Sequence, residues 1–131
     1  MPHHISLDGI DITVEGQVLE MRAQGVRNVE NGLDGARLFA LMENENIRAV
    51  MFDSRQADYQ LTPPEAQERA RLVARMSRGR IVAHIIRKDQ EEQFEPLLLS
   101  HRDMGSDCRS FRSRSKGRAW IDSALAHQAE G

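Results

Sequence analysis

Apolar and polar residues alternate through the first part of the chain. Apolar residues at positions 5 and 7, and again at 10, 12 and 14, have polar neighbours. This period of two is typical of a half-buried strand. Asp8-Gly9 is a turn dipeptide, and a second connection at Gly16 precedes apolar residues at 18, 19 and 21. The segment therefore predicts a hairpin or small meander with its main turn at Gly16.

Beyond Gly25 the hydrophobic period becomes helical. Apolar residues at 33, 38, 41 and 42 predict a first helix, which the polar segment 43–46 ends. Two short apolar runs, 47–52 and 81–86, predict strands that are buried on both faces. A third short strand is expected over 108–111.

Three further helices follow from capping signals and periodicity. Thr62, Pro63 and Glu65 have the spacing of a capping box with proline at the first helical position, and this helix is expected to end near Gly79. A third helix is predicted over about 91–101, and Ser113 is a candidate cap for a last helix with an apolar face.

The predicted element order is ββαβαβαβα. Strands that alternate with helices of ten or more residues favour right-handed crossovers and a mainly parallel sheet. We therefore expect an α/β fold in which a mixed, mainly parallel sheet begins with a β-hairpin and carries four helices. A chain of 131 residues has the size of one domain, 1–131.

Composition restricts the class of protein. The chain is 40% hydrophobic and 29% charged, and its net charge of −2 gives no overall attraction for nucleic acid. The lone Cys108 cannot form an intramolecular disulfide, and no apolar run approaches the roughly 20 residues of a membrane helix. The N-terminal residues also lack a signal-peptide pattern. A cytoplasmic location is the expectation.

The element order and three sequence segments carry a family resemblance. These segments are the strand that ends in Val50–Arg55, the late strand with Phe111, and the helical step Ala119-Trp120-Ile121. Together they make the chain resemble the STAS domains, and more narrowly the small stand-alone bacterial proteins of the SpoIIAA-like group. The resemblance implies the STAS fold and a regulatory or binding module rather than an enzyme.

In phosphorylated antagonists of the STAS type, an Asp-Ser-Ser-Gly segment carries the switch serine. The matching position here is Thr62, but Leu61 replaces the aspartate and Pro63-Pro64 replaces Ser-Gly. These differences argue against a phosphorylation switch at Thr62. The wider fold also resembles lipid-carrying CRAL-TRIO domains, which makes a small hydrophobic or anionic ligand conceivable.

The best candidate site is the predicted loop from Asp53 to Thr62. In open α/β sheets, ligands bind outside the carboxyl ends of parallel strands, where this loop begins. Arg55 could donate two hydrogen bonds to an anion, with Asp53 orienting it and Tyr59 forming an aromatic wall. Asp53, Ser54, Arg55 and Tyr59 are therefore the predicted ligand-binding residues. The alternative is an ordinary loop carboxylate paired with an arginine.

Other constellations give weaker signals. Cys108 is interpreted as a small buried hydrophobe, and no metal-ligand spacing groups the five histidines. Among them, His84 lies among isoleucines and needs a hydrogen-bond partner. No phosphate-binding loop follows a strand, and no cofactor is predicted. Arginines and a lysine between 109 and 118 are interpreted as a solvated edge, or as an edge that meets the acidic half of a second copy, rather than as a nucleic-acid patch.

The leading hypothesis is a non-enzymatic STAS-like module that binds a protein partner or a small hydrophobic or anionic ligand. The alternative is a small enzyme that uses the same loop. Residues 1–66 carry 11 acidic and 5 basic side chains, whereas residues 67–131 carry 9 and 13. This asymmetry, and the sheet edge left by an initial hairpin, favour a homodimer.

Overall fold

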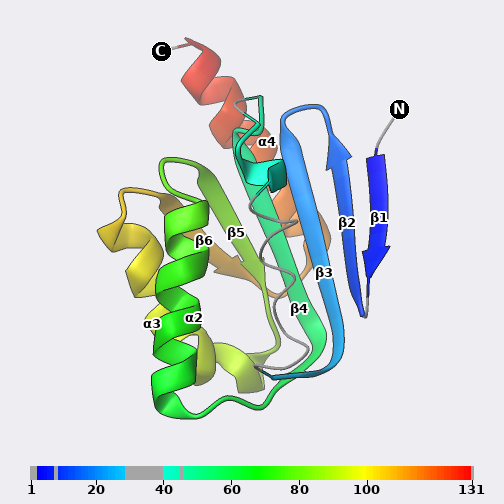
Figure 1. Cartoon of the computed structure of the whole chain (residues 1–131). Coiled ribbons are helices and arrows are strands. Elements are labelled where there is room, and N and C mark those ends of the chain that lie inside the picture. Colours follow the sequence, from blue (N-terminus) through cyan, green and yellow to red (C-terminus); the bar gives the residue numbers. More distant parts are fainter. Residues whose placement is uncertain (1–2, 8, 29–39, 45, 131) are drawn as a thin grey trace.

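The computed structural model describes residues 3–7, 9–28, 40–44 and 46–130, and these contain one six-stranded sheet (Figure 1). The strands neighbour one another in chain order, from β1 at one edge to β6 at the other. Their bounds are β1 His3–Leu7, β2 Ile10–Glu15, β3 Val18–Arg27, β4 Ala49–Tyr59, β5 Ile81–Ile85 and β6 Asp107–Phe111.

The sheet is mixed, as the alternation of strands and helices predicts. β1, β2 and β3 form an antiparallel meander, and β3 to β6 are parallel. The initial segment is thus the small meander rather than the single hairpin, because both turns connect paired strands. The first predicted helix lies mostly outside the described residues, although residues 40–42 are helical.

Local signals place the remaining helices. α2 (Pro63–Met76) begins at the predicted capping box of Thr62 and Glu65. A short 3-10 helix, η1 (Lys88–Gln90), leads into α3 (Glu91–Asp103). α4 (Arg114–Glu130) begins after Ser113, whose hydroxyl oxygen accepts the Lys116 backbone N–H at 3.2 Å. Hydroxyl caps of this kind satisfy helix N–H groups that have no partner within the helix.

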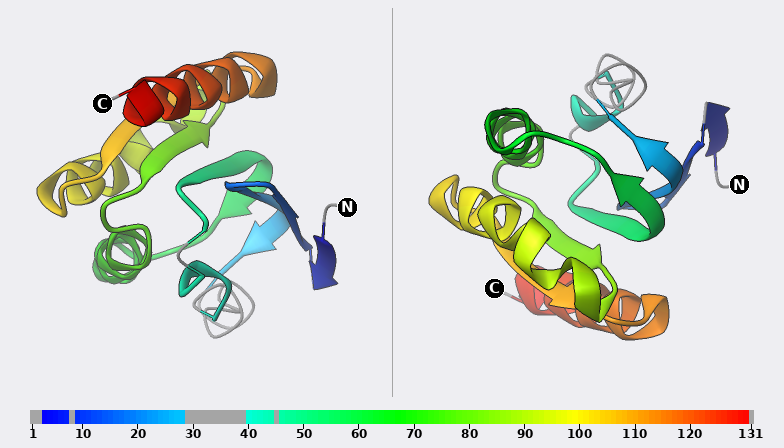
Figure 2. Two further views of the ribbon diagram at one scale, coloured as in Figure 1. Left: turned by 90° about the horizontal axis from the view of Figure 1, so that it is seen from above. Right: turned by 90° about the horizontal axis from the view of Figure 1, so that it is seen from below.

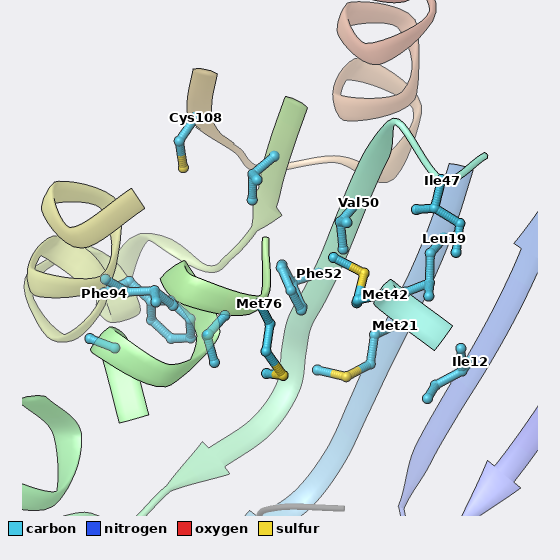
Figure 3. Close-up of a cluster of buried hydrophobic side chains, with 14 of the residues drawn as sticks. Ile12, Leu19, Met21, Met42, Ile47, Val50, Phe52, Met76, Phe94 and Cys108 are labelled. Carbon is cyan, nitrogen blue, oxygen red and sulfur yellow. The ribbon is translucent and has the colours of Figure 1, made fainter. Parts of the chain in front are cut away.

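Helices cover both faces of the parallel strands. Viewed along the strands in Figure 2, α4 lies on one face and α2 on the opposite one. Under α2 and α3 is the larger apolar cluster, and Figure 3 shows part of it with side chains from β3, β4 and both helices. Under α4 is a smaller cluster built from Val18, Ala49, Met51, Ile81, Ala83, Ile85 and Ile121.

The length of β4 differs from the prediction. The apolar run predicts a strand over 47–52, whereas β4 continues through seven more residues to Tyr59. The extension pairs with the second half of β3, from Gln24↔Gln56 to Arg27↔Tyr59. Because polar side chains fill this part of β4, a hydrophobic pattern could not reveal it.

Candidate functional site

The predicted site region lies within β4, at the level where its neighbours β5 and β6 end. Asp53 pairs with Ile85, the last residue of β5, and Ile85 pairs with Phe111, the last residue of β6. Asp53 therefore lies level with the carboxyl ends of β5 and β6, although its own strand continues to Tyr59. The prediction of a loop over Asp53–Thr62 is wrong, however, because residues 53–59 belong to β4. Only residues 60–62 connect β4 to α2.

Asp53 and Arg55 form a well-aligned ion pair at this level of the sheet. The Arg55 guanidinium donates from Nε and from one Nη to the two carboxylate oxygens of Asp53, at 3.0 and 2.8 Å. Asp53 is buried, with 3% of its surface exposed. Burial raises the pKa of Asp53, but hydrogen bonds from Arg55 and the charges of Arg55 and Arg22 outweigh it, so the pKa lies below its usual value.

Two more arginines join this pair through a second carboxylate. Arg114, the first residue of α4, donates from Nε and Nη2 to the two carboxylate oxygens of Glu20 on β3, both at 2.6 Å. Arg22 lies 3.8 Å from Glu20 and 4.0 Å from Asp53. We call these five residues the arginine cluster. Its three guanidinium groups face two carboxylates, which leaves one positive charge.

Two neighbouring arginines extend the positive edge. Arg87 donates to the backbone carbonyl of Arg55 and pairs with Asp89. Arg112 donates to the carbonyl of Ile86 at 3.4 Å and also pairs with an acidic residue of α3. The guanidinium groups therefore come from several elements that meet beyond the strand ends.

Ser54 and Tyr59 do not join Asp53 and Arg55. Tyr59 packs edge-on against Phe94 of α3, with ring centroids 5.5 Å apart, and belongs to the cluster under α2 and α3. The Ser54 hydroxyl is buried and lies 3.3 Å from the Tyr59 hydroxyl. The four predicted residues therefore form two pairs, Asp53 with Arg55 and Ser54 with Tyr59. Ser54 points away from its neighbours Asp53 and Arg55 because consecutive strand residues face opposite sides of the sheet. The role of these four residues in ligand binding stays a prediction.

An irregularity in β4 separates the two halves of this region. The pairing advances from Arg22↔Asp53 to Gln24↔Gln56, so β4 carries one more residue than β3 over this step. Gln90 donates from its buried side-chain amide to the carbonyls of Ser54 and Ala57, at 2.9 and 3.1 Å. A β-bulge of this kind redirects side chains beside a site.

Thr62 serves as a structural cap. Its hydroxyl oxygen accepts the Glu65 backbone N–H at 3.4 Å, and the Glu65 carboxylate accepts the Thr62 N–H at 2.8 Å. The α2 N-terminus thus carries its own acidic group, which weakens its attraction for an external anion.

The arginines between 109 and 118 are spread over several contacts. Arg109 lies over the Trp120 ring at 5.1 Å, and Arg118 pairs with Asp122 at 3.1 Å. Arg112 and Arg114 also have the partners described above, so each of these four arginines contacts another residue of the chain.

The structure also brings together three residues that no sequence spacing grouped. His84 of β5, His101 of α3 and Cys108 of β6 are all buried. Their potential ligand atoms lie within 4.8 Å of one another, and the two imidazole Nε2 atoms are 3.0 Å apart. The His84 ring also stacks on Phe52, with centroids 4.9 Å apart. His84 thus has the partner that the sequence required, but the partner could be found only from the fold.

Burial controls the protonation of these three groups. Burial, aided by the positive charge of Arg69, lowers the pKa of His101 to about 4. The pKa of His84 falls well below its usual value through burial, through His101 and through Arg69. Burial raises the pKa of the Cys108 thiol to about 12. At neutral pH the cluster therefore holds two neutral imidazoles and a neutral thiol.

Within the residues that the structure describes, no helix has both the length and the apolar character needed to cross a membrane.

Comparison with known proteins supports the fold but no assigned activity. No protein-family model matches the chain, and no curated protein is similar in sequence. The structure is similar to that of an uncharacterised DUF3478-family protein from Shewanella loihica, described as having a SpoIIAA-like fold. The TM-score is 0.60 at 19% identity, over 89% of this chain and 97% of the other. The resemblance to STAS domains is thereby confirmed at the level of fold: this chain has the SpoIIAA-like, STAS-type α/β fold.

Proposed function

We propose that this protein is a non-catalytic binding module that recognises an anionic group of a ligand or partner protein at the arginine cluster. The carrying observation is the arrangement of Arg22, Arg55 and Arg114, whose side chains are 44%, 37% and 45% exposed. A guanidinium has five N–H donors. Arg55 and Arg114 each use two on a carboxylate, so the remaining donors can meet an incoming anion.

The carboxylates of Asp53 and Glu20 favour recognition of an anion of defined shape over general attraction of negative charge. Asp53 and Glu20 fix the planes of two guanidinium groups before a ligand arrives, which reduces the entropy lost on binding. Their negative charges also weaken the overall attraction, because only one positive charge remains in the arginine cluster. We therefore expect weak binding that depends on geometry and on salt.

The state of Asp53 supports a binding role over the alternative, a small enzyme. A general acid or base works best with a pKa near the working pH. The Asp53 carboxylate instead accepts two guanidinium hydrogen bonds, and its pKa lies below the usual range. Asp53 is better suited to orienting Arg55 than to transferring protons.

The proposal can be tested by NMR titration of the isotopically labelled protein. The probes are inorganic phosphate, which is a small free anion, and a glutamate-rich peptide, which carries its negative charges on a chain. We expect the largest amide shifts near Arg22, Arg55 and Arg114. A response to the peptide alone would indicate a protein partner, whereas a response to both would indicate the anion itself.

Two variants that each remove one positive charge distinguish binding at the arginine cluster from general electrostatic attraction of the anion. Arg22→Gln removes a guanidinium whose carboxylate contacts are long, so Asp53 and Glu20 keep their closer partners. Arg71→Gln makes the same charge change on the exposed side of α2. Binding should weaken in Arg22→Gln and be retained in Arg71→Gln. Equal weakening in both variants, or shifts confined to other regions, would contradict the proposal.

A further inference from the structure

We propose that His84, His101 and Cys108 form a buried binding site for a soft monovalent metal ion with the chemistry of Cu⁺. This soft-metal site is separate from the arginine cluster and does not depend on the proposed anion binding. It lies under α3, where β5 and β6 supply one ligand each and the helix supplies the third.

The geometry allows one ion to reach all three side chains. The two Nε2 atoms are 3.0 Å apart, less than twice a metal–nitrogen bond of about 2.0 Å, so both can bind the same ion. One ligand atom from each of the three residues lies within 4.8 Å of the others. Modest movement of the Cys108 side chain would close a three-coordinate site.

The two imidazoles are deeply buried and only partly satisfied by hydrogen bonds. Among the described residues, the Nδ1 atoms of His84 and His101 are buried and have no hydrogen-bond partner. The residues are only 1% and 0% exposed. Buried polar atoms are nearly always satisfied, and one hydrogen bond between two neutral imidazoles cannot satisfy four ring nitrogens. A metal ion on the two Nε2 atoms would replace their mutual hydrogen bond and leave one proton on each Nδ1 atom.

Charge balance selects the ion. A cysteine thiolate and two neutral imidazoles carry one negative charge, so Cu⁺ gives a neutral site, whereas Zn²⁺ leaves a positive charge. Around the site lie Phe52 and Phe94, and Arg69 adds a positive charge of its own. Burying an uncompensated charge in such surroundings is costly. Thiolate and imidazole are also suitable ligands for copper.

Binding must be coupled to loss of the thiol proton. The reaction replaces the S–H bond of Cys108 by an S–Cu bond and releases one proton, with no change in the oxidation state of either atom. Because burial raises the pKa of this thiol to about 12, the free protein holds the proton tightly near neutral pH. The apparent affinity should therefore rise about tenfold for each unit of pH.

The test is anaerobic titration of the full chain with Cu⁺ against a colorimetric Cu⁺ chelator. We expect one equivalent of Cu⁺ per chain and one proton released per ion. X-ray absorption at the copper edge should show one sulfur and two nitrogen ligands. This measurement uses the parent protein, so it decides the ligand set even where a variant fails to fold.

Variants assign the ligands. Cys108→Ser, which is nearly isosteric, should lose more than the roughly 10–100-fold in affinity that outer-shell changes cost. The double variant His4→Gln/His127→Gln removes two exposed imidazoles and should bind as the parent does. Failure to retain Cu⁺ against the chelator, a copper site without sulfur, or displacement by equimolar Zn²⁺ would overturn the proposal.

Discussion

Lowering the pH from 7 to 5 should destabilise the metal-free protein through its buried histidines. His101 has a folded-state pKa of about 4, against about 6.5 for an unperturbed histidine. The His84 pKa is shifted in the same direction. Between these values the unfolded chain binds protons that the folded protein does not, so the free energy of unfolding falls as the pH falls.

The size of the effect follows from the width of that window. Each pH unit over which one histidine is protonated only in the unfolded state costs about 1.4 kcal/mol. The window from about 6.5 to about 4 spans more than two units, so His101 alone accounts for roughly 3 kcal/mol once the pH is below both values. Its contribution is fully present above pH 6.5 and is lost progressively below it.

Urea unfolding, followed by Trp120 fluorescence from pH 7.5 to 5, measures this loss. The whole of this range lies above the unfolded-state pKa values of carboxylates, about 3.9–4.3, so histidines dominate the slope. His101→Gln should be less stable at pH 7.5. Its free energy of unfolding should also change less with pH, by up to about 1.4 kcal/mol per unit.

His4→Gln is the matched control, because the His4 side chain is 59% exposed. It should keep the slope of the parent. The reasoning would be refuted if His101→Gln and the parent lost stability equally between pH 6.5 and 5. It would also be refuted if His4→Gln flattened the slope as much as His101→Gln.

Three substitutions and one assembly measurement test other parts of the structure. Arg55→Ala should destabilise by about 1–3 kcal/mol in urea unfolding, since it leaves the buried Asp53 carboxylate without its main partner. Thr62→Ala should cost about 1 kcal/mol through loss of the α2 cap. Gly117→Ala should lower the melting temperature, because the new Cβ would overlap Ile85 Cδ1 and overpacking costs typically about 1–3 kcal/mol. β1 lies at an edge of the sheet, and light scattering should give about twice the mass of one chain if this edge pairs with a second copy.

A specific outcome would contradict each of these four predictions. Unchanged stability in Arg55→Ala would mean that Arg22 alone can hold Asp53. A Thr62→Ser variant should retain most of the cap, so equal losses in the serine and alanine variants would assign Thr62 another role. Melting of Gly117→Ala at or above the parent temperature would mean that Ile85 can move away at little cost. A monomeric mass at tens of micromolar would exclude a stable dimer.

Much of the fold followed from local signals in the sequence. Alternation predicted the initial meander, buried apolar runs predicted the starts of β4 and β5, and Thr62 and Ser113 marked two helix starts. The second half of β4 could not be predicted in this way. Most of its residues are polar, and only Ala57 and Tyr59 add to the apolar core, so no apolar run marks it, although it pairs with β3.

The site was harder to predict because it depends on contacts between distant segments. The sequence analysis expected Asp53 to contact Arg55, and the structure pairs them, but Asp53 lies inside β4 rather than at its end. It could not show that Arg114 approaches from 94 residues away to join Glu20. Nor could it show that His84 meets His101, because imidazole contacts across a fold leave no local spacing.

The identical order of strands in the chain and in the sheet has a consequence for synthesis on the ribosome. Each strand pairs with the one made just before it, so the sheet can grow from β1 towards β6 as the chain emerges. α4 is made after β6, yet it covers the apolar face that includes Met51, Ala83 and Ile85. Until the α4 residues leave the exit tunnel, that face remains open to water and to chaperones. The stability of the nascent chain should therefore rise only when α4 packs its Ile121 onto this face.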